Sequence, residues 1–66
     1  MQISLKAARV NANLTQRETA EKMGIDRSTV INWESGKTYP TAPQLIQLCT
    51  LYGVGVDDIF LIPVST

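Results

Sequence analysis

The sequence contains no histidine and a single cysteine, Cys49. One cysteine cannot form an internal disulfide, and no residues stand at the spacing of zinc ligands. The chain also lacks a phosphate-binding glycine loop and a nucleophile beside an activating base. Its acidic pair, Asp57 and Asp58, stands near an expected helix start, where carboxylates stabilise the helix dipole. These absences predict that the protein is not an enzyme and that it binds no metal or cofactor.

Neither sign of charge is in excess. Six basic and six acidic residues give a net charge of zero and a pI of about 6.1. An indiscriminate nucleic-acid binder is expected to be strongly basic, so this balance counts against one. A specific binder with its few cations on one face remains compatible with it. Long apolar runs and a signal peptide are also absent, so a cytoplasmic location is expected.

The chain is short. Its 66 residues make one domain, residues 1–66, in which 44% of the residues are hydrophobic and 18% are charged, as is typical of a globular protein. A domain of this size buries only about 60% of the surface of its unfolded chain. No separate ligand-binding or oligomerisation domain fits, so any partner must bind the same small fold.

Start and stop signals predict a compact all-α domain of five short helices. They cover residues 4–12, 16–23, 26–35, 42–52 and 55–60. Ser4 is the expected N-cap of the first helix. Residues 61–66 are expected to fray, and the stretch 60–64 is the one segment that could form a strand, at a dimer interface.

The caps of the middle helices are the best defined. Thr15 and Glu18 have the spacing of a capping box, as do Thr41 and Gln44. The carboxylate of Asp26 is expected to cap the free amides of the third helix.

Residues 16–35 have the pattern of two helices joined by a tight turn. Ala20 is small enough for a close helix crossing, and Gly24 is suited to a turn with positive φ. Apolar residues lie on one side of the second helix of this pair, among them Val30 and Trp33, which we assign to the core. The other side is polar and able to form hydrogen bonds. This order is typical of a DNA-binding helix-turn-helix.

The full pattern resembles the phage-repressor and Cro type of helix-turn-helix domain, often called XRE-type or lambda-repressor-like. The resemblance extends from about Leu5 to Phe60. It rests on an ordered set of residues, namely Arg9, Thr15, Gln16, Ala20, Met23, Gly24, Thr29, Val30, Trp33, Glu34, Gly36, Lys37, Pro40, Leu45, Leu48, Tyr52, Gly53, Val54 and Asp57.

The resemblance implies that helix 26–35 lies in the major groove and that its first turn contacts base edges. By position, the implied base contacts are Arg27, Ser28 and Asn32, while Thr29 can touch a thymine methyl group or a phosphate. The side chains fit this role, because Arg matches guanine O6 and N7 and Asn matches adenine N6 and N7. The alternative for Arg27 is a solvated charge at a helix start.

The resemblance also implies phosphate contacts, which are Gln16, Arg17, Ser35, Lys37 and Thr38. So few contacts predict a moderate dependence of affinity on salt. For Arg17, an ion pair with Glu21 on the helix surface is an equal alternative.

In that family an arginine of the first helix pairs with the glutamate that ends the third. Here the pair would be Arg9 and Glu34, and it would orient the third helix. The alternative is an ordinary surface charge at each position. Two residues depart from the family pattern: Thr19 replaces an aliphatic residue, which suggests thinner packing, and Ile31 lies on the outward side.

The resulting functional hypothesis is a sequence-specific regulator of transcription that binds double-stranded DNA. A stand-alone repressor of phage or plasmid type is expected, because the sequence begins at Met1 and no second domain follows. One such domain contacts too few base pairs to define a genomic site, so a homodimer on a palindrome is expected. The alternative is a protein-interaction module on the same fold, such as an antitoxin or antirepressor, that uses helices four and five.

Overall fold

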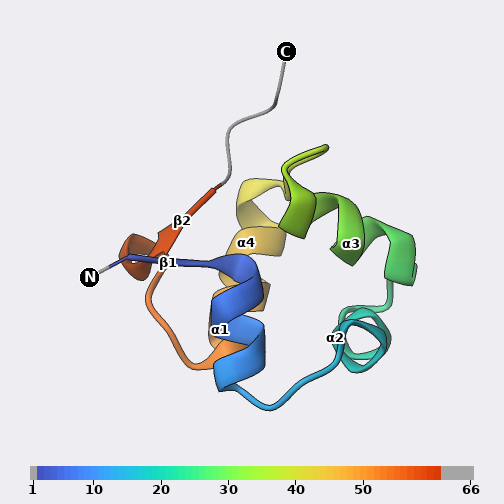
Figure 1. The fold of residues 1–66 in the computed structure, drawn as a ribbon, viewed down its shortest axis with the longest axis horizontal. Helices are drawn as coiled ribbons and strands as arrows, with labels where there is room; N and C mark the ends of the chain where they lie inside the picture. Colours follow the sequence, from blue (N-terminus) through green and yellow to red (C-terminus); the bar gives the residue numbers. More distant parts are fainter. Residues whose placement is uncertain (1, 62–66) are drawn as a thin grey trace.

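Four α-helices occupy most of the part of the chain that the structure, a computed structural model, describes, which is residues 2–61 (Figure 1). They are α1 (Leu5–Asn11), α2 (Gln16–Met23), α3 (Arg27–Ser35) and α4 (Ala42–Tyr52). Among the described helices, none has both the length and the apolar character that a membrane crossing requires.

Hydroxyl side chains fix the first turns of α1, α2 and α4. The Ser4 hydroxyl accepts a hydrogen bond from a first-turn amide of α1. The Thr15 hydroxyl accepts from the amide of Glu18, and the Glu18 carboxylate accepts from the amide of Thr15, both at 3.0 Å. Thr41 and Gln44 form the same reciprocal pair at the start of α4. Both predicted capping boxes are therefore confirmed.

A glycine ends each helix of the α2 and α3 pair. Gly24 ends α2 with φ of 68°, and Gly36 ends α3 with φ of 81°. Side chains rarely tolerate this left-handed conformation, whereas glycine has no Cβ to clash. The two glycines thus allow the chain to leave α2 and α3 abruptly, which keeps α3 short.

The predicted fifth helix is wrong. Residues Val56–Asp58 form a single 3-10 turn, η1, and Ile59–Phe60 form a strand, β2, that pairs in parallel with β1 (Ile3–Ser4). The Asp58 carboxylate accepts from the amide of Gly55 at 3.1 Å, which closes the turn. Ile59 then becomes extended because pairing with Ile3 buries it against the core. The fold is therefore mainly helical, with four α-helices and a two-stranded sheet in the described residues.

The strand expected over residues 60–64 is also changed in place and partner. Only its first residue, Phe60, belongs to β2, and β2 pairs within the same chain. Residues 62–66, which carry most of the expected frayed tail, lie outside the described residues.

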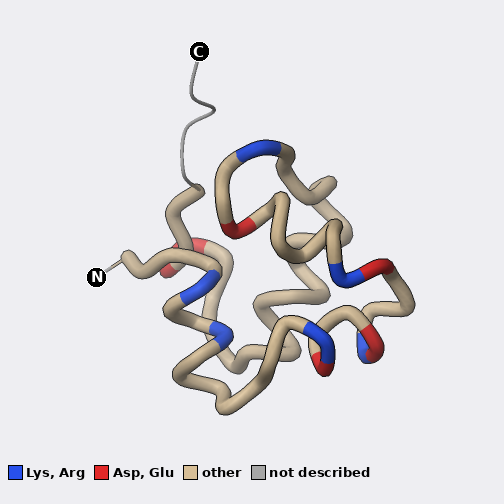
Figure 2. Tube along the Cα trace, turned by 45° about the vertical axis from the view of Figure 1, so that its right-hand side comes forward, with Lys and Arg blue, Asp and Glu red and all other residues tan. Residues whose placement is uncertain are grey.

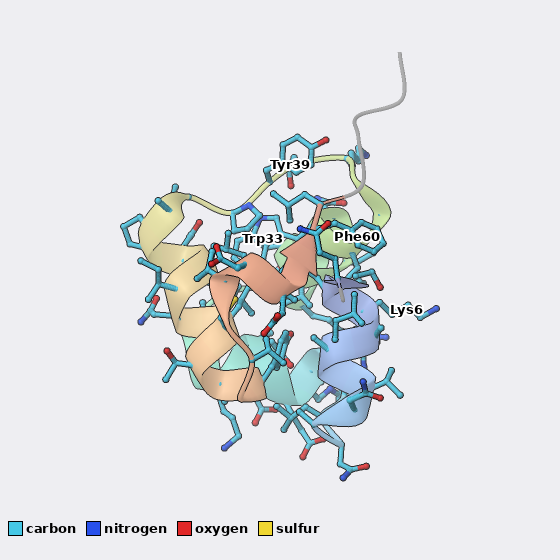
Figure 3. All side chains as sticks on the ribbon, turned by 90° about the vertical axis from the view of Figure 1, so that its left-hand side faces the viewer. Lys6, Trp33, Tyr39 and Phe60 are labelled. Carbon is cyan, nitrogen blue, oxygen red and sulfur yellow. The ribbon has the colours of Figure 1, made fainter. Side chains whose placement is uncertain are left out.

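The core lies between α1, α3, α4 and β2. Its buried side chains are Leu5, Ala8, Trp33, Leu48, Cys49, Tyr52 and Ile59. The predicted core positions of Trp33 and Cys49 are confirmed, and burial raises the pKa of the Cys49 thiol. Figure 3 shows Trp33 within the body of the molecule and Lys6 extending away from it.

Thr19 does not leave the packing thin. Its side chain is fully buried, and the Tyr52 hydroxyl donates a hydrogen bond to the Thr19 oxygen at 3.4 Å. Burial raises the pKa of Tyr52, so this hydroxyl keeps its proton near neutral pH. The expectation of thinner packing is therefore wrong, because a buried polar contact between α2 and α4 takes the place of the family's aliphatic residue.

Candidate nucleic-acid interface

The turn between α2 and α3 is built from backbone hydrogen bonds. The amides of Gly24 and Ile25 donate to carbonyl groups in the last turn of α2, the second of them to Ala20 at 3.0 Å. Ala20 and Val30 are buried, so the two helices can pack closely there. α3 follows as a separate rod at the edge of the molecule, beside α2 (Figure 1).

The first turn of α3 presents polar side chains to solvent. Arg27 and Ser28 are exposed, and Thr29 and Asn32 are half-buried. None of the four is packed beneath a neighbouring element. All four predicted base-contact residues therefore remain able to meet a ligand that lies along α3.

Asp26 has the extended backbone of an N-cap, but its carboxylate makes no capping hydrogen bond. It accepts a hydrogen bond from the Ser28 hydroxyl instead. The expected capping role of the Asp26 side chain is therefore wrong, because the nearby hydroxyl competes with the backbone amides for the carboxylate.

A depression of about 490 Å³ joins the start of α2 to the start of α3. Its lining residues come from three segments and are Arg9, Thr15, Gln16, Arg17 and Arg27. Three of these five residues are arginines, whose positive charge favours an anion. Arginine also matches the geometry of a phosphate oxygen pair. This depression can hold one phosphate of a nucleic-acid backbone.

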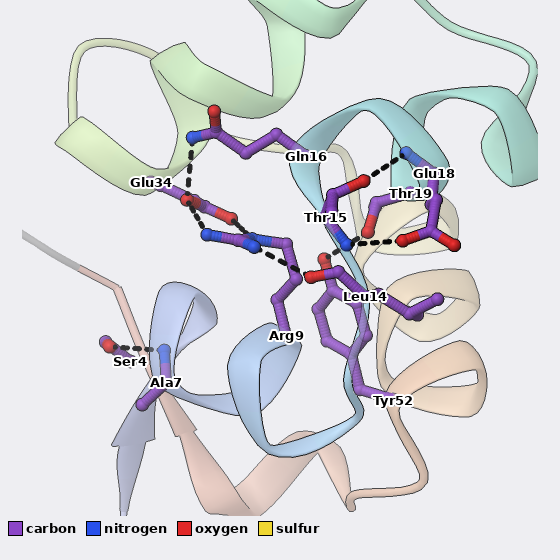
Figure 4. Close-up of polar contacts among 10 residues, drawn as sticks. All are labelled: Ser4, Ala7, Arg9, Leu14, Thr15, Gln16, Glu18, Thr19, Glu34 and Tyr52. Atoms are coloured by element: carbon purple, nitrogen blue, oxygen red, sulfur yellow. Dashed lines mark hydrogen bonds and ion pairs between the residues drawn. The ribbon is translucent and has the colours of Figure 1, made fainter.

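Glu34 lies at the centre of a polar cluster that includes Arg9 and Gln16, two of the residues that line this depression (Figure 4). Arg9 Nε donates to Glu34 Oε2 at 2.6 Å, and Arg9 Nη2 donates to Oε1 at 3.3 Å. Arg9 Nη1 donates to the carbonyl oxygen of Leu14 at 2.7 Å. Gln16 Nε2 donates to Glu34 Oε1 at 3.1 Å. The cluster joins α1, the loop before α2, α2 and α3, and so it fixes the angle at which α3 is held.

The Arg9 charge is compensated by Glu34, so Arg17 and Arg27 supply the available charge of the depression. No ion pair joins Arg17 to Glu21 in the described part of the chain, where Arg17 is exposed. Gln16 uses one amide hydrogen for Glu34, and the second remains for a phosphate.

The other end of α3 carries the remaining predicted phosphate contacts. Ser35, Lys37 and Thr38 are all exposed. The Asn32 carbonyl oxygen accepts from the Ser35 hydroxyl at 3.1 Å and from the amides of Lys37 and Thr38 at 3.0 and 3.3 Å. These bonds hold the loop against the last turn of α3. A nine-residue helix is about 14 Å long, so Lys37 and Arg27 flank α3 at opposite ends.

Acidic residues interrupt the basic ones over this surface. Figure 2 shows basic and acidic positions close together along α2 and at the start of α3. The long-range field is therefore weak, and contacts at short range must supply most of the affinity for an anionic partner.

Two contacts of this surface had no signal in the sequence. Gln16 and Glu34 are 18 residues apart, and no local pattern relates them. The hydrogen bond from Ser28 to Asp26 joins near neighbours, but the same residues also fit an Asp26 side chain that caps the helix, so the sequence did not distinguish the two arrangements.

Comparisons with known proteins agree on one family. A family model described as helix-turn-helix matches residues 5–59. An uncharacterised HTH-type transcriptional regulator from Methanocaldococcus jannaschii is 38% identical over 61 residues, which is 92% of either chain. The HTH-type transcriptional regulator ImmR of Bacillus subtilis is 40% identical over 53 residues, 80% of this chain and 42% of its own. The HTH-type transcriptional activator BcrR of Enterococcus faecalis is 34% identical over 55 residues, 83% of this chain and 27% of its own. No solved structure gives a significant match.

Proposed function

The chain belongs to the helix-turn-helix family of phage-repressor type, and from this premise we propose that it regulates transcription by binding specific sites on double-stranded DNA. α3 is the element that enters the major groove. Arg27, Ser28, Thr29 and Asn32 contact base edges. Gln16, Arg17, Ser35, Lys37 and Thr38 contact phosphates on either side.

The arginine-lined depression between α2 and α3 carries this proposal. Arg17 and Arg27 line it, and Arg27 belongs to the exposed first turn of α3, which supports an anion site beside that turn. A phosphate held there would bring the major groove against Arg27 and Ser28. Phosphate contacts position a protein on DNA and base contacts specify the sequence, so the two sites have complementary roles.

Repression by occlusion of a promoter is the regulatory effect that needs the fewest contacts from this surface. Occlusion needs only DNA binding, whereas activation also needs a contact with the transcription machinery. One of the relatives, BcrR, is named an activator. Repression is therefore proposed from this chain's own surface and not from the names of its relatives. A homodimer on a palindromic operator would supply the length of contact that one α3 lacks.

In vitro selection of bound DNA tests the proposal directly. We expect enrichment of a palindrome whose half-sites lie about 34 Å apart, one helical turn. A selection that yields no enriched sequence, with binding equal to that of random DNA, would refute the proposal.

A protein-interaction module is the second candidate, and a second hollow favours it. A groove of about 340 Å³ between α2 and α4 is lined by Lys22, Met23, Ile46, Gln47, Thr50 and Leu51. Ile46 is 56% exposed and lies beside the partly buried Met23 and Leu51, so this groove offers apolar surface to a partner. Gel-shift assays at two salt concentrations separate the candidates, because a pure interaction module should show no salt-dependent affinity for DNA.

A further inference from the structure

The hydrogen bond between Ser28 and Asp26 determines which chemical group Ser28 can recognise. A serine hydroxyl has one hydrogen to donate and two lone pairs that accept. Here the hydrogen is donated to the Asp26 carboxylate. Hydrogen bonds to an ionised acceptor are roughly twice as strong as neutral ones. The lone pairs of Ser28 Oγ are therefore the part of the hydroxyl left for a ligand.

We propose that Asp26 is a positioning residue that makes Ser28 a reader of amino groups in the major groove. This inference rests on the proposed function and names the base edge that one of its contacts selects. Adenine N6 and cytosine N4 present amino hydrogens in the major groove, whereas guanine O6 and thymine O4 present acceptors. When Asp26 orients it, Ser28 Oγ can accept from adenine N6 or cytosine N4. It then has no hydrogen to donate to guanine O6 or thymine O4.

Two features of α3 support this assignment. Asp26 makes no capping hydrogen bond, so its carboxylate is held by Ser28 and not by the helix backbone. Both residues are exposed, and they flank Arg27, which lines the depression between α2 and α3. The carboxylate itself only accepts hydrogen bonds, so it opposes guanine and thymine at the same position for the same reason.

The test compares base preferences, position by position, for the wild-type protein, four single variants and one double variant. Wild type is expected to prefer adenine or cytosine about tenfold at one position of each half-site, the size of a single hydrogen-bond contribution. Ser28→Ala is expected to lose this preference. Asp26→Ala frees the hydroxyl hydrogen, so the preference should fall to about twofold or less while other positions keep theirs.

Asp26→Asn and Asp57→Ala are the matched controls. Both remove one negative charge, as Asp26→Ala does. The asparagine oxygen can still accept from Ser28, so Asp26→Asn should retain the preference. Asp57 lies in η1, on the side of the molecule away from α3 (Figure 1), so Asp57→Ala should also retain it. The melting temperature of each variant checks that the fold is kept.

Coupling between the two residues completes the test. In a Ser28→Ala background, Asp26→Ala should cause no further change at that position. Sequence-specific binding with the same base preference in Asp26→Ala as in wild type would overturn this inference and leave the proposed function intact. Absence of any specific binding by wild type would overturn both.

Discussion

At the scale of single residues, Glu34 affects both the stability of the fold and the orientation of α3. Its carboxylate receives hydrogen bonds from Arg9 and Gln16 and is 6% exposed, so it links α3 to two earlier segments away from water. A buried charge of this kind is stable only while its partner is present. The same contact therefore serves the stability of the fold and the orientation of α3.

Glu34→Ala should lower the free energy of unfolding by about 3 kcal/mol, because it leaves the Arg9 guanidinium buried without its counter-charge. Urea denaturation measures this loss. Glu21→Ala, which removes an exposed acid of α2, is the control and should stay within about 0.5 kcal/mol of wild type. Equal stabilities for the two variants would show that the buried pair contributes nothing. Replacing both partners, as Arg9→Met with Glu34→Leu, should recover most of the loss.

Arg27 and Lys37 are both exposed cations, but we predict different losses when each is removed. Arg27→Ala should relax the preference at one base pair, with a loss of roughly 1–3 kcal/mol in discrimination. Lys37→Ala should weaken binding to all sequences similarly and reduce the salt slope by about 1. Binding measured at several salt concentrations on cognate and mutated sites distinguishes the two.

Lys6→Ala is the control for this pair of variants, because Lys6 extends from α1 away from the body of the molecule (Figure 3). It removes the same charge and should leave both the preference and the slope unchanged. If Arg27→Ala behaved as Lys6→Ala does, α3 would not be the recognition element.

At the scale of elements, the two capping boxes provide a matched comparison. Thr15 and Thr41 hold the first turns of α2 and α4 through the same pair of hydrogen bonds. Thr15 also lines the anion-binding depression, and Thr41 does not. One cap therefore serves stability alone, and the other also shapes the proposed interface.

Thr15→Ala and Thr41→Ala should each lower the free energy of unfolding by about 1 kcal/mol, the usual contribution of such a cap. Only Thr15→Ala should also weaken DNA binding, because it disorders the amides beside the depression. Thermal unfolding and a binding titration on the same samples measure both effects. A similar loss of affinity in Thr41→Ala would mean that stability, and not the interface, accounts for it.

The stability of the protein at acidic pH should depend on the capping box of α2. The Thr15 amide donates to the Glu18 carboxylate, and this hydrogen bond, followed by the influence of the Thr15 side chain, lowers the pKa of Glu18 below the ordinary value of 4.5. The stabilisation is therefore present above that value and is lost as the pH falls through the lower pKa of the folded state.

Glu18→Gln keeps an acceptor at this position but cannot titrate. We expect the gap in melting temperature between wild type and this variant to shrink between about pH 6 and about pH 3. Glu21→Gln removes a neighbouring acid outside the cap and is the control. A gap that stays constant over this range would contradict the assigned pKa shift.

At the scale of the whole molecule, the proposed homodimer requires a contact surface outside α3. Val56 and Phe60 are each 43% exposed and lie in η1 and β2. Such exposed apolar side chains outside α3 suit a dimer contact. β2 already uses one edge for β1, so a second copy can only meet its other edge or its exposed side chains.

Deletion of residues 61–66 should shift the protein from dimer to monomer in sedimentation experiments, if the segment after β2 takes part in the contact. It should also reduce binding to a palindrome more than binding to a half-site. Phe60→Ser provides an independent test, because it removes an exposed apolar side chain and leaves the backbone pairing of β2 available. Unchanged sedimentation in both variants would place the dimer contact elsewhere.

The sequence by itself determined the helices whose ends are local events. Thr15, Gly24, Thr41 and Gly53 define their boundaries through hydrogen bonds and backbone angles within a few residues, so the limits of α2 and α4 and the turn before α3 followed from the residue pattern. The family and the polar face of α3 were predictable for the same reason.

Only the tertiary structure decided the contacts between distant segments. Ile59 becomes a strand because Ile3 lies beside it. The local sequence of residues 55–60 favours a helix only weakly, so the pairing with β1 decides its conformation. The choice of Gln16 as a partner of Glu34, and of Thr19 as a partner of Tyr52, depends on how helices pack and not on any local spacing. Local hydrogen bonds are specified by neighbours in the chain, whereas long-range ones exist only once the core has formed.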